Sequence, residues 1–248
     1  MESYNEFAPF YDRFIRPVDY PARARYFDAL MRPLLQDGRL LLDLACGTGT
    51  LSIELSRLGY EVVGVDASQE MLAYAQQKAW EADLPIRFFH QRMERLELGG
   101  CVDGCICALD SLNHITDSKT LRRALLRVAA HLLPGGVFLF DLNTPYKHRT
   151  LLADNCYCYE DGDTFCVWQN HTEELLTQID LDFFTRQKDG RYLRTGESFA
   201  ERGYEREEIE ALLDACGFRL IAVYGDDTLE PPEETTERWI FLTQKGEK

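Results

Sequence analysis

The 248-residue sequence has no long apolar run and is short of basic residues. No segment approaches the roughly 18 consecutive apolar residues that a membrane-spanning helix requires, so we expect no membrane partner. The N-terminal stretch MESYNEFAPFYDRF lacks a basic start followed by an apolar block, so it does not resemble a signal peptide. These absences lead us to expect a cytoplasmic protein.

Tight cysteine pairs are also absent. The eight cysteines include no C-x-x-C pair, and the nearest patterns are C-x-C at 105–107 and at 156–158. A zinc site usually shows two ligand pairs at tighter spacing. Cys46, Cys216 and the pair at 105–107 stand inside apolar segments, where cysteine behaves as a small hydrophobic residue. The sequence therefore predicts reduced thiols and no metal site.

Positive charge is scarce, with 27 Lys and Arg residues against 42 Asp and Glu residues and a net charge of −15. Nucleic-acid binding depends largely on cationic neutralisation of phosphates. The one dense basic stretch, RRALLR at 122–127, lies on a predicted helix, where such charges usually form a solvated face. Nucleic acid is therefore a disfavoured partner, and the sequence gives no indication of the oligomeric state.

From residue 39 onward, short apolar runs alternate with helical periodicity, which is typical of a parallel sheet covered by helices. Strands are predicted in RLLLDLA, EVVGVD, IRFFH, VDGCICAL, GGVFLFDL, RLIAVYG and ERWIFLTQK. Helices are predicted in TLSIELSRLG, SQEMLAYAQQKAW, residues 118–132 and YEREEIEALLDACGF. Ser68 is the predicted N-cap of the second of these helices. The pattern predicts an α/β fold, a Rossmann-like seven-stranded mixed sheet with helices on both faces.

Residues 151–204 interrupt this alternation with four strand-like segments. The Asp-Gly pair at 189–190 between alternating runs is a strong hairpin signal. We expect an antiparallel β subdomain inserted into a core of residues 1–150 and 205–248, with residues 1–35 as a helical lid. The insertion is expected to pack on one side of the sheet and to cover the site. Its aromatic residues are expected either to line a substrate pocket or to form a small core of their own: Tyr157, Tyr159, Phe165 and Trp168.

The stretch LLDLACGTGT places a glycine-rich turn directly after the first predicted strand, where open parallel sheets bind nucleotides. Ser52 stands where the dinucleotide fingerprint G-x-G-x-x-G has its third glycine, which disfavours a nicotinamide dehydrogenase. Asp66 ends the second strand, where its carboxylate can accept hydrogen bonds from ribose hydroxyls. Asp43 would repel a phosphate and suits an amino-bearing ligand. The pattern predicts a nucleoside ligand without a phosphate.

These motifs resemble the class I S-adenosylmethionine-dependent methyltransferases. LLDLACGTGT, VVGVDASQEMLAYAQQKA, IRFFHQRMERL and LLPGGVFLFDL are similar to successive motifs of that family, over roughly residues 35–145. YNEFAPFYD, ALDSLNHI and the inserted strands resemble a bacterial subgroup of small cytosolic methyltransferases. The resemblance implies S-adenosylmethionine as cofactor and a small-molecule methyl acceptor. The acceptor atom stays open, and an RNA or protein methyltransferase and a non-catalytic S-adenosylmethionine-binding regulator remain alternatives.

The resemblance also implies residue roles. It places cofactor contacts at Tyr11, Asp43, Ala45, Gly47, Gly49, Asp66, Ala67, Met71, Arg92, Met93 and Leu109. Asp43 would hold the amino group of the cofactor and Asp66 its ribose. Met71 would either border the adenine or belong to the core. Arg92 departs from the family, in which an acidic residue often precedes the equivalent of Met93.

Candidates for the acceptor side are His114, Tyr11 and Asp110, which we predict as catalytic residues, together with Tyr4, Asn113 and His171. Tyr4 and Tyr11 share a helical stripe of the expected lid, and aromatic faces attract a sulfonium as they attract other cations. Asp110 would flank the sulfonium side of the cofactor. His114 follows the fourth strand, and a neutral imidazole there can take a proton. A purely structural role for His114 is the alternative.

Overall fold

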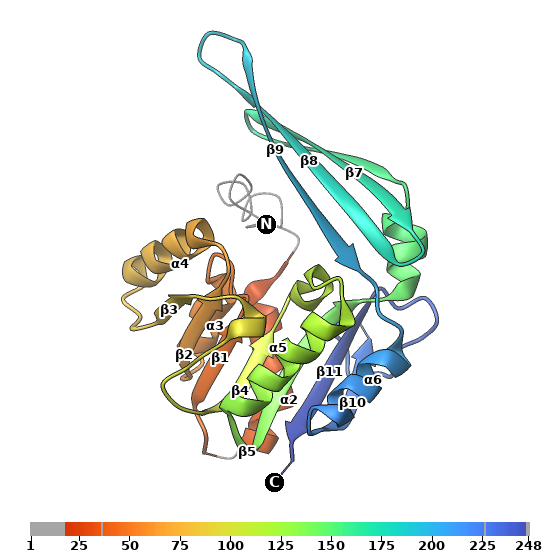
Figure 1. Ribbon diagram of the computed structural model, residues 1–248. Helices are drawn as coiled ribbons and strands as arrows, with labels where there is room; N and C mark the ends of the chain where they lie inside the picture. Colours follow the sequence, from red (N-terminus) through yellow and green to blue (C-terminus); the bar gives the residue numbers. More distant parts are fainter. Residues whose placement is uncertain (1–17, 36, 226, 247–248) are drawn as a thin grey trace.

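The computed structural model describes residues 18–35, 37–225 and 227–246. These residues form a seven-stranded sheet flanked by helices and a separate four-stranded sheet, as Figure 1 shows. The fold class predicted from the sequence is therefore confirmed. Tyr4 and Tyr11, with the first half of the expected lid, lie outside the described residues.

The core is built from alternating strands and helices. In chain order its elements are α2 (Tyr20–Leu35), β1 (Leu40–Leu44), α3 (Thr50–Arg57), β2 (Glu61–Asp66), α4 (Gln69–Glu81), β3 (Arg87–His90), η1 (Met93–Arg95), β4 (Val102–Cys107), η2 (Ser111–His114), α5 (Ser118–His131), β5 (Leu132–Asn143), η3 (Lys147–Leu152), α6 (Arg206–Ala215), β10 (Phe218–Gly225) and β11 (Arg238–Lys245). The strands lie in the order β10-β11-β5-β4-β1-β2-β3. Strands β1 to β5 pair in parallel, and β11 is antiparallel to both β5 and β10. The carboxyl ends of five strands therefore meet at one edge, where open α/β sheets bind their ligands.

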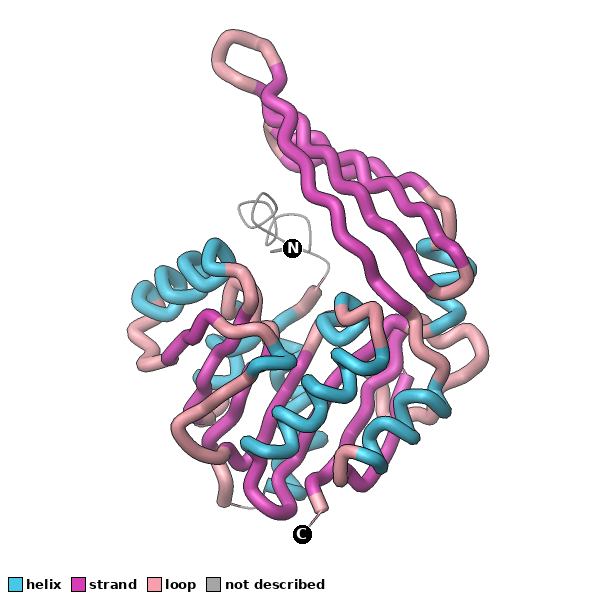
Figure 2. The backbone as a smooth tube through the Cα atoms, viewed as in Figure 1, coloured by secondary structure: helices cyan, strands magenta, loops and turns pink. Residues whose placement is uncertain are grey.

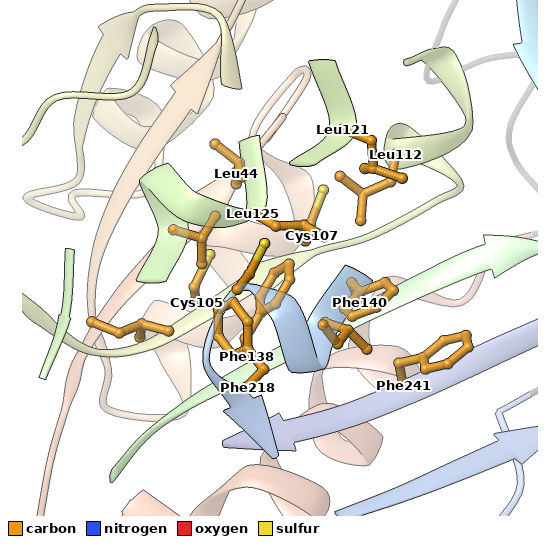
Figure 3. Close-up of a cluster of buried hydrophobic side chains, with 14 of the residues drawn as sticks. Leu44, Cys105, Cys107, Leu112, Leu121, Leu125, Phe138, Phe140, Phe218 and Phe241 are labelled. Atoms are coloured by element: carbon orange, nitrogen blue, oxygen red, sulfur yellow. The ribbon is translucent and has the colours of Figure 1, made fainter. Parts of the chain in front are cut away.

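Helices cover both faces of this sheet, which explains the nearly continuous apolar runs of its central strands. On β5, Phe138 and Phe140 pack with side chains of α5 and α6, whereas Leu139 packs with those of α2 and α3. Figure 3 shows the first of these clusters, in which Leu121 and Leu125 of α5 point towards the strands. A strand buried on both faces has no position for an exposed polar side chain. Any acidic residue within such a strand therefore needs a specific explanation.

Local capping agrees with the sequence prediction for α4. The Oγ of Ser68 accepts a hydrogen bond of 3.2 Å from the backbone N–H of Met71 and so caps the helix. Asp117 performs the same function for α5, where its carboxylate accepts from the N–H of Thr120 at 2.9 Å. Both helices thus begin at the positions that place their apolar stripes against the sheet.

The insertion forms the second sheet, with strands β6 (Cys156–Asp161), β7 (Thr164–Glu173), β8 (Leu176–Arg186) and β9 (Tyr192–Arg202) paired antiparallel in that order. The predicted alternation is confirmed, since Ile179, Leu181 and Phe183 gather on one face. The predicted packing against one side of the large sheet is wrong. Figures 1 and 2 show the second sheet standing beyond the carboxyl-end edge of the first, and β9 contacts η2 while β7 contacts η3. Its apolar stripe clusters within the insertion itself.

Candidate functional site

The turn after β1 has an unusual backbone. Ala45, Gly47 and Gly49 have φ angles of 58°, 54° and 72°, in the left-handed region that favours glycine. A Cβ atom added to Gly47 would have no atom within 4 Å, whereas one added to Gly49 would lie 2.8 Å from the Cβ of Ala75. Gly49 is also the N-cap of α3 and makes no side-chain cap. The two glycines therefore serve different needs: Gly49 permits close packing on α4, and Gly47 keeps space open at the sheet edge.

This difference can be tested by a matched pair of variants. Gly49→Ala combines a left-handed backbone with overpacking and should lower the free energy of unfolding by about 2–4 kcal/mol. Gly47→Ala adds only backbone strain and should lower it by about 1 kcal/mol. Urea denaturation of both variants and the parent protein would measure the two losses. Equal losses would contradict the assigned difference.

Asp66, at the end of β2, ties this turn to the neighbouring strand. One carboxylate oxygen accepts the N–H of Gly47 at 2.8 Å, and the other accepts the N–H of Ser68 at 2.8 Å. Burial raises the pKa of Asp66, and the two backbone hydrogen bonds oppose that rise. The Asp66 carboxylate, a hydrogen-bond acceptor, thus lies at the end of β2 beside the end of β1, next to the space that Gly47 leaves open.

Asp43 is a second acid close to this turn; it lies within β1 and is 2% exposed. Ser52 Oγ donates a 2.5 Å hydrogen bond to its Oδ2. Burial raises the pKa of Asp43 to about 7, and the charge of Asp66 adds to the effect while Ser52 opposes it. Within the described ranges, no Lys, Arg or His nitrogen lies within 4 Å of this carboxylate. Ser52, in the place of a third glycine, therefore supports an acid that suits a cationic ligand group.

A cavity of about 370 Å³ opens at this edge of the sheet. The predicted site residues that line it are Ala45, Gly47, Asp66, Ala67, Met71, Arg92, Met93, Leu109 and His114. A smaller cavity of about 20 Å³ beside the turn is lined by Asp43 and again by Ala45, Gly47 and Leu109. Gly49 lines neither of them. Phe199 and Ala200 of β9 also line the larger cavity, so the insertion contributes one of its walls.

Arg92 and Glu94, which both line this cavity, form an ion pair. Arg92 Nε lies 2.6 Å from Glu94 Oε1. Partial burial opposes ionisation, but the hydrogen bond from Arg92 keeps the pKa of Glu94 below its ordinary value. Sequence reasoning noted that no acid precedes Met93 and missed the acid that follows it. The sequence could have indicated this acid, because Glu94 directly follows Met93.

The loop after β4 is strained and is held by an acid that the sequence reasoning overlooked. Leu109 and Asp110 have φ angles of 58° and 54°, which are uncommon for residues other than glycine. Both donate their backbone N–H groups to Asp141, at 2.8 and 2.5 Å. Arg238 bridges Asp110 and Asp141 at 2.8 and 2.6 Å, and Arg23 contacts Asp141 at 3.0 Å. Asp141, an acid within the apolar run of β5, thus fixes the loop that leads into η2.

His114 ends η2 and faces the main cavity. Its ring lies 5.1 Å from the ring of Phe199, and its Nε2 lies 3.7 Å from Oε1 of Glu201. Burial lowers the pKa of His114, although the charge of Asp110 opposes the shift. The imidazole is therefore neutral near pH 7 and has a carboxyl group beside it.

The structure separates the remaining candidates. Asn113 is fully buried and donates hydrogen bonds to the carbonyls of Asn143 and Arg202 at 3.3 and 2.8 Å, which ties β9 to β5. His171 has a side chain 68% exposed, 3.1 Å from Asp154, and lines none of the cavities described here. Asp110 does not line the main cavity.

A second cavity, of about 310 Å³, lies between η3, β6, β7 and the end of β9. Asp110, Asn143 and Glu201 line its inner end. Three of the four aromatic residues singled out in the insertion also line it: Tyr157, Tyr159 and Trp168. Phe165 does not. The aromatic residues of the insertion thus face a cavity that adjoins the functional edge.

All eight cysteines are free thiols. No group of three or more His, Cys, Asp or Glu residues in the described chain is arranged to hold a metal ion. Among the helices of residues 18–35, 37–225 and 227–246, none has the length and apolarity needed to cross a membrane.

Comparison with known proteins points to one family. The methyltransferase domain family matches residues 41–136. The chain is 34% identical over 246 residues to the candidate methyltransferase YqeM of Bacillus subtilis, covering 98% of this chain and 97% of that protein. It is 30% identical to a glycine/sarcosine N-methyltransferase of Parasynechococcus marenigrum, over 88% of this chain and 77% of the relative. The crystal structure of an S-adenosylmethionine-dependent methyltransferase from Clostridium acetobutylicum superposes with a TM-score of 0.89 at 34% identity, covering 98% and 99% of the two chains.

Proposed function

The chain belongs to the S-adenosylmethionine-dependent methyltransferases, and we propose that it methylates a small-molecule acceptor held between the sheet edge and the insertion. The observation that carries the proposal is a pair of acids beside the open space at Gly47: Asp43, which is 2% exposed, and Asp66, which is half-buried and lines the main cavity. A small acceptor is supported by the net charge of −15, which disfavours nucleic acid. The glycine/sarcosine N-methyltransferase among the relatives acts on small molecules.

The residues of the main cavity fit the cofactor group by group. Asp43, buried and distant from any described cation, would accept the amino group of the methionyl part. Asp66 would accept the ribose hydroxyls, since its carboxylate faces the cavity from the end of β2. Ala67 and Met71 would border the adenine, with Glu94 and the backbone of Met93 at the exocyclic amino group. Met71 is both buried and cavity-lining, so its two predicted roles are compatible.

When bound, the cofactor supplies a methyl carbon already activated by the adjacent sulfonium. The protein therefore mainly has to position the acceptor, and well-oriented reactants can gain about 7–11 kcal/mol in this way. His114, on the cavity wall with a lowered pKa, would accept a proton from an acceptor that arrives protonated, or orient it. Asp110 would act indirectly, because Asp141 and Arg238 hold it outside the main cavity.

The core and the insertion have different functions in this arrangement. We propose that residues 1–150 and 205–248 form the cofactor-binding core and that residues 151–204 select the acceptor. The lid role of residues 1–35 and of Tyr11 stays a proposal from the sequence. A binding-only regulator would bind the cofactor without releasing S-adenosylhomocysteine from any acceptor. An RNA methyltransferase would show steeply salt-dependent RNA binding.

The cofactor assignment is tested by Asp66→Asn. Loss of the charge removes charge-assisted hydrogen bonds to the ribose, and we expect S-adenosylmethionine to bind roughly tenfold to a hundredfold more weakly. Isothermal titration calorimetry measures the change. Asp83→Asn is the matched control, because Asp83 is exposed and already has a φ of 55° that asparagine tolerates. Absence of binding to the parent protein at millimolar cofactor, or equal affinities of the two variants, would contradict the assignment.

A further inference from the structure

We propose that the second cavity binds the methyl acceptor, that this acceptor is an amine carried on a flat or ring-shaped body, and that Glu201 receives the proton of the amine. The inference rests on the proposed function and adds the chemical class of the acceptor. It is carried by three features of the cavity: a buried carboxyl group without its own cation, an aromatic wall, and a boundary shared with the main cavity.

Glu201 is the carboxyl group in question. It is 4% exposed and lines the inner end of the cavity. Its Oε2 accepts a 3.2 Å hydrogen bond from Asn143 Nδ2. Its Oε1 receives no hydrogen bond from the residues that the structure describes, and the nearest cationic candidate there is His114 at 3.7 Å. A buried acid usually has its oxygens satisfied, so this oxygen points to a ligand.

The surrounding charges leave Glu201 as the acid without a dedicated cation. Asp110 and Asp141 share Arg238, and Asp141 also contacts Arg23. Lys147, the cation on the cavity wall, donates its hydrogen bond to Asn143 Oδ1 at 3.0 Å. An ammonium group bound beside Glu201 would give this carboxylate the ion-pair partner that no described Lys or Arg supplies within 4 Å.

The pKa of Glu201 agrees with the lack of an ion-paired Lys or Arg beside it. Burial raises its pKa to about 8, and the charge of Asp110 adds to the rise. The hydrogen bond from Asn143 and the charges of Lys147 and Arg238 oppose it. At neutral pH the empty cavity therefore holds a proton on Glu201, which a bound ammonium group would displace. Glu237, an exposed acid, lines the same cavity and adds negative charge.

The opposite wall is aromatic. Tyr159 lies edge-on to Trp168 with 6.4 Å between ring centroids, and Tyr157 stacks on Tyr159 at 6.4 Å. Trp168 Nε1 donates a 2.6 Å hydrogen bond to Asn170, which fixes the indole. Indole and phenol faces attract cations and pack on rings. The wall thus suits an amine whose body is flat or cyclic.

Neighbouring residues line the two cavities. Leu109 lines the main cavity and Asp110 the second, and the same holds for Ala200 and Glu201 on β9. His114, on the main side, is within 3.7 Å of Glu201. The proposal therefore requires the amine to reach past the Glu201 carboxylate, towards His114 and the main cavity.

The reaction balances with these groups. The ammonium form of the acceptor transfers one proton to the Glu201 carboxylate. The nitrogen lone pair then forms a bond to the methyl carbon, the carbon–sulfur bond breaks, and its electron pair stays on sulfur. The products are the N-methylated ammonium and S-adenosylhomocysteine. Glu201 keeps this proton and so returns to the protonated state of the empty cavity, and the one proton released overall is the proton displaced when the ammonium bound.

The test uses matched amines and alcohols, titrated calorimetrically into the full chain without cofactor at pH 7. The pairs are 2-phenylethylamine with 2-phenylethanol and glucosamine with glucose, which separates aromatic from sugar bodies. We expect an amine to bind at least about tenfold more tightly than its neutral partner. About one proton should be released on binding, seen as a heat that changes with the ionisation enthalpy of the buffer.

Glu201→Gln, which mimics the protonated acid and should fold, is expected to weaken amine binding about tenfold or more and to abolish the proton release. Glu173→Gln is the control, because that side chain is 84% exposed on β7 of the same insertion. Trp168→Leu should independently weaken the binding of the amine, so the test remains valid if Glu201→Gln does not fold. Amines that bind no better than alcohols, or equal effects of the two Glu→Gln variants, would overturn the inference. If S-adenosylmethionine still binds in that case, the proposed function stands and only the acceptor class fails.

Discussion

Arg238→Met is expected to lower the free energy of unfolding by about 3–5 kcal/mol at pH 7. Arg238 bridges Asp110 and Asp141 at 2.8 and 2.6 Å, and Asp141 is 0% exposed. Without the guanidinium, the Asp141 carboxylate keeps only Arg23 as a counter-ion, and Asp110 loses its ion-pair partner and keeps the hydrogen bond from Asn143 Nδ2 at 3.0 Å. Removing one partner of a buried ion pair leaves an uncompensated charge, and this lowers the free energy of unfolding far more than removing a surface ion pair does. Urea denaturation gives the value directly.

The pH dependence identifies the mechanism of this loss. Burial alone would raise the pKa of Asp110, but the charge of Arg238, helped by Lys147 and His114, holds it below its ordinary 3.8. A carboxyl group whose pKa is lowered on folding stabilises the protein above its unfolded pKa, and this stabilisation is lost as the pH falls. The difference between Arg238→Met and the parent protein should therefore shrink below about pH 4.

The control for Arg238→Met is Arg206→Met. Arg206 forms an exposed pair with Glu210 four residues later on α6, at 2.6 Å, and its loss should change stability by about 0.5 kcal/mol or less. Arg238→Lys keeps one charge but cannot reproduce the planar bridge, so an intermediate loss is expected. A loss near that of Arg206→Met would show that the Asp110–Asp141 cluster does not depend on Arg238.

The part of the site that sequence could predict is local. Asp43, Gly47 and Ser52 lie within ten consecutive residues, at the end of β1, in the turn and at the start of α3. Asp66 ends the next strand, so the pairing of β1 with β2 brings it to them. The physical signal was an acid inside an apolar run. Asp141 carried the same signal in β5, yet its meaning depends on Arg23 and Arg238.

The part that sequence could not predict depends on tertiary contacts between distant segments. Glu201 lies in the insertion and His114 in the core, and nothing in their local patterns indicates that they meet. The direction of the insertion was mispredicted for a similar reason. Alternation identifies an apolar face such as that of Phe183, but not whether it packs on the core or within its own sheet.

Asp43→Asn is expected to stabilise the cofactor-free protein at pH 8 while weakening its affinity for S-adenosylmethionine. Burial raises the pKa of Asp43 to about 7, so the folded chain keeps a proton that the unfolded chain releases near its ordinary 3.8. The stability linked to this proton is complete below about pH 4 and is lost as the pH rises to about 7, a change of roughly 4 kcal/mol. Asparagine has no charge to bury. Urea denaturation should therefore show no gain at pH 4 and a gain of up to about 4 kcal/mol at pH 8.

Calorimetry at pH 8 supplies the second half of the test, in which Asp43→Asn should bind S-adenosylmethionine about tenfold or more weakly. Asp163→Asn, in the exposed turn between β6 and β7, should change neither quantity. A destabilised Asp43→Asn at pH 8, or an unchanged affinity, would contradict the role of Asp43. A gain in stability together with a loss of cofactor affinity distinguishes a ligand-binding acid from a structural one. If the carboxylate only held Ser52, its replacement by asparagine would lower the stability of the protein. If it binds the cationic amino group of the cofactor, its buried charge lowers the stability of the cofactor-free protein, and binding of the cofactor compensates that cost.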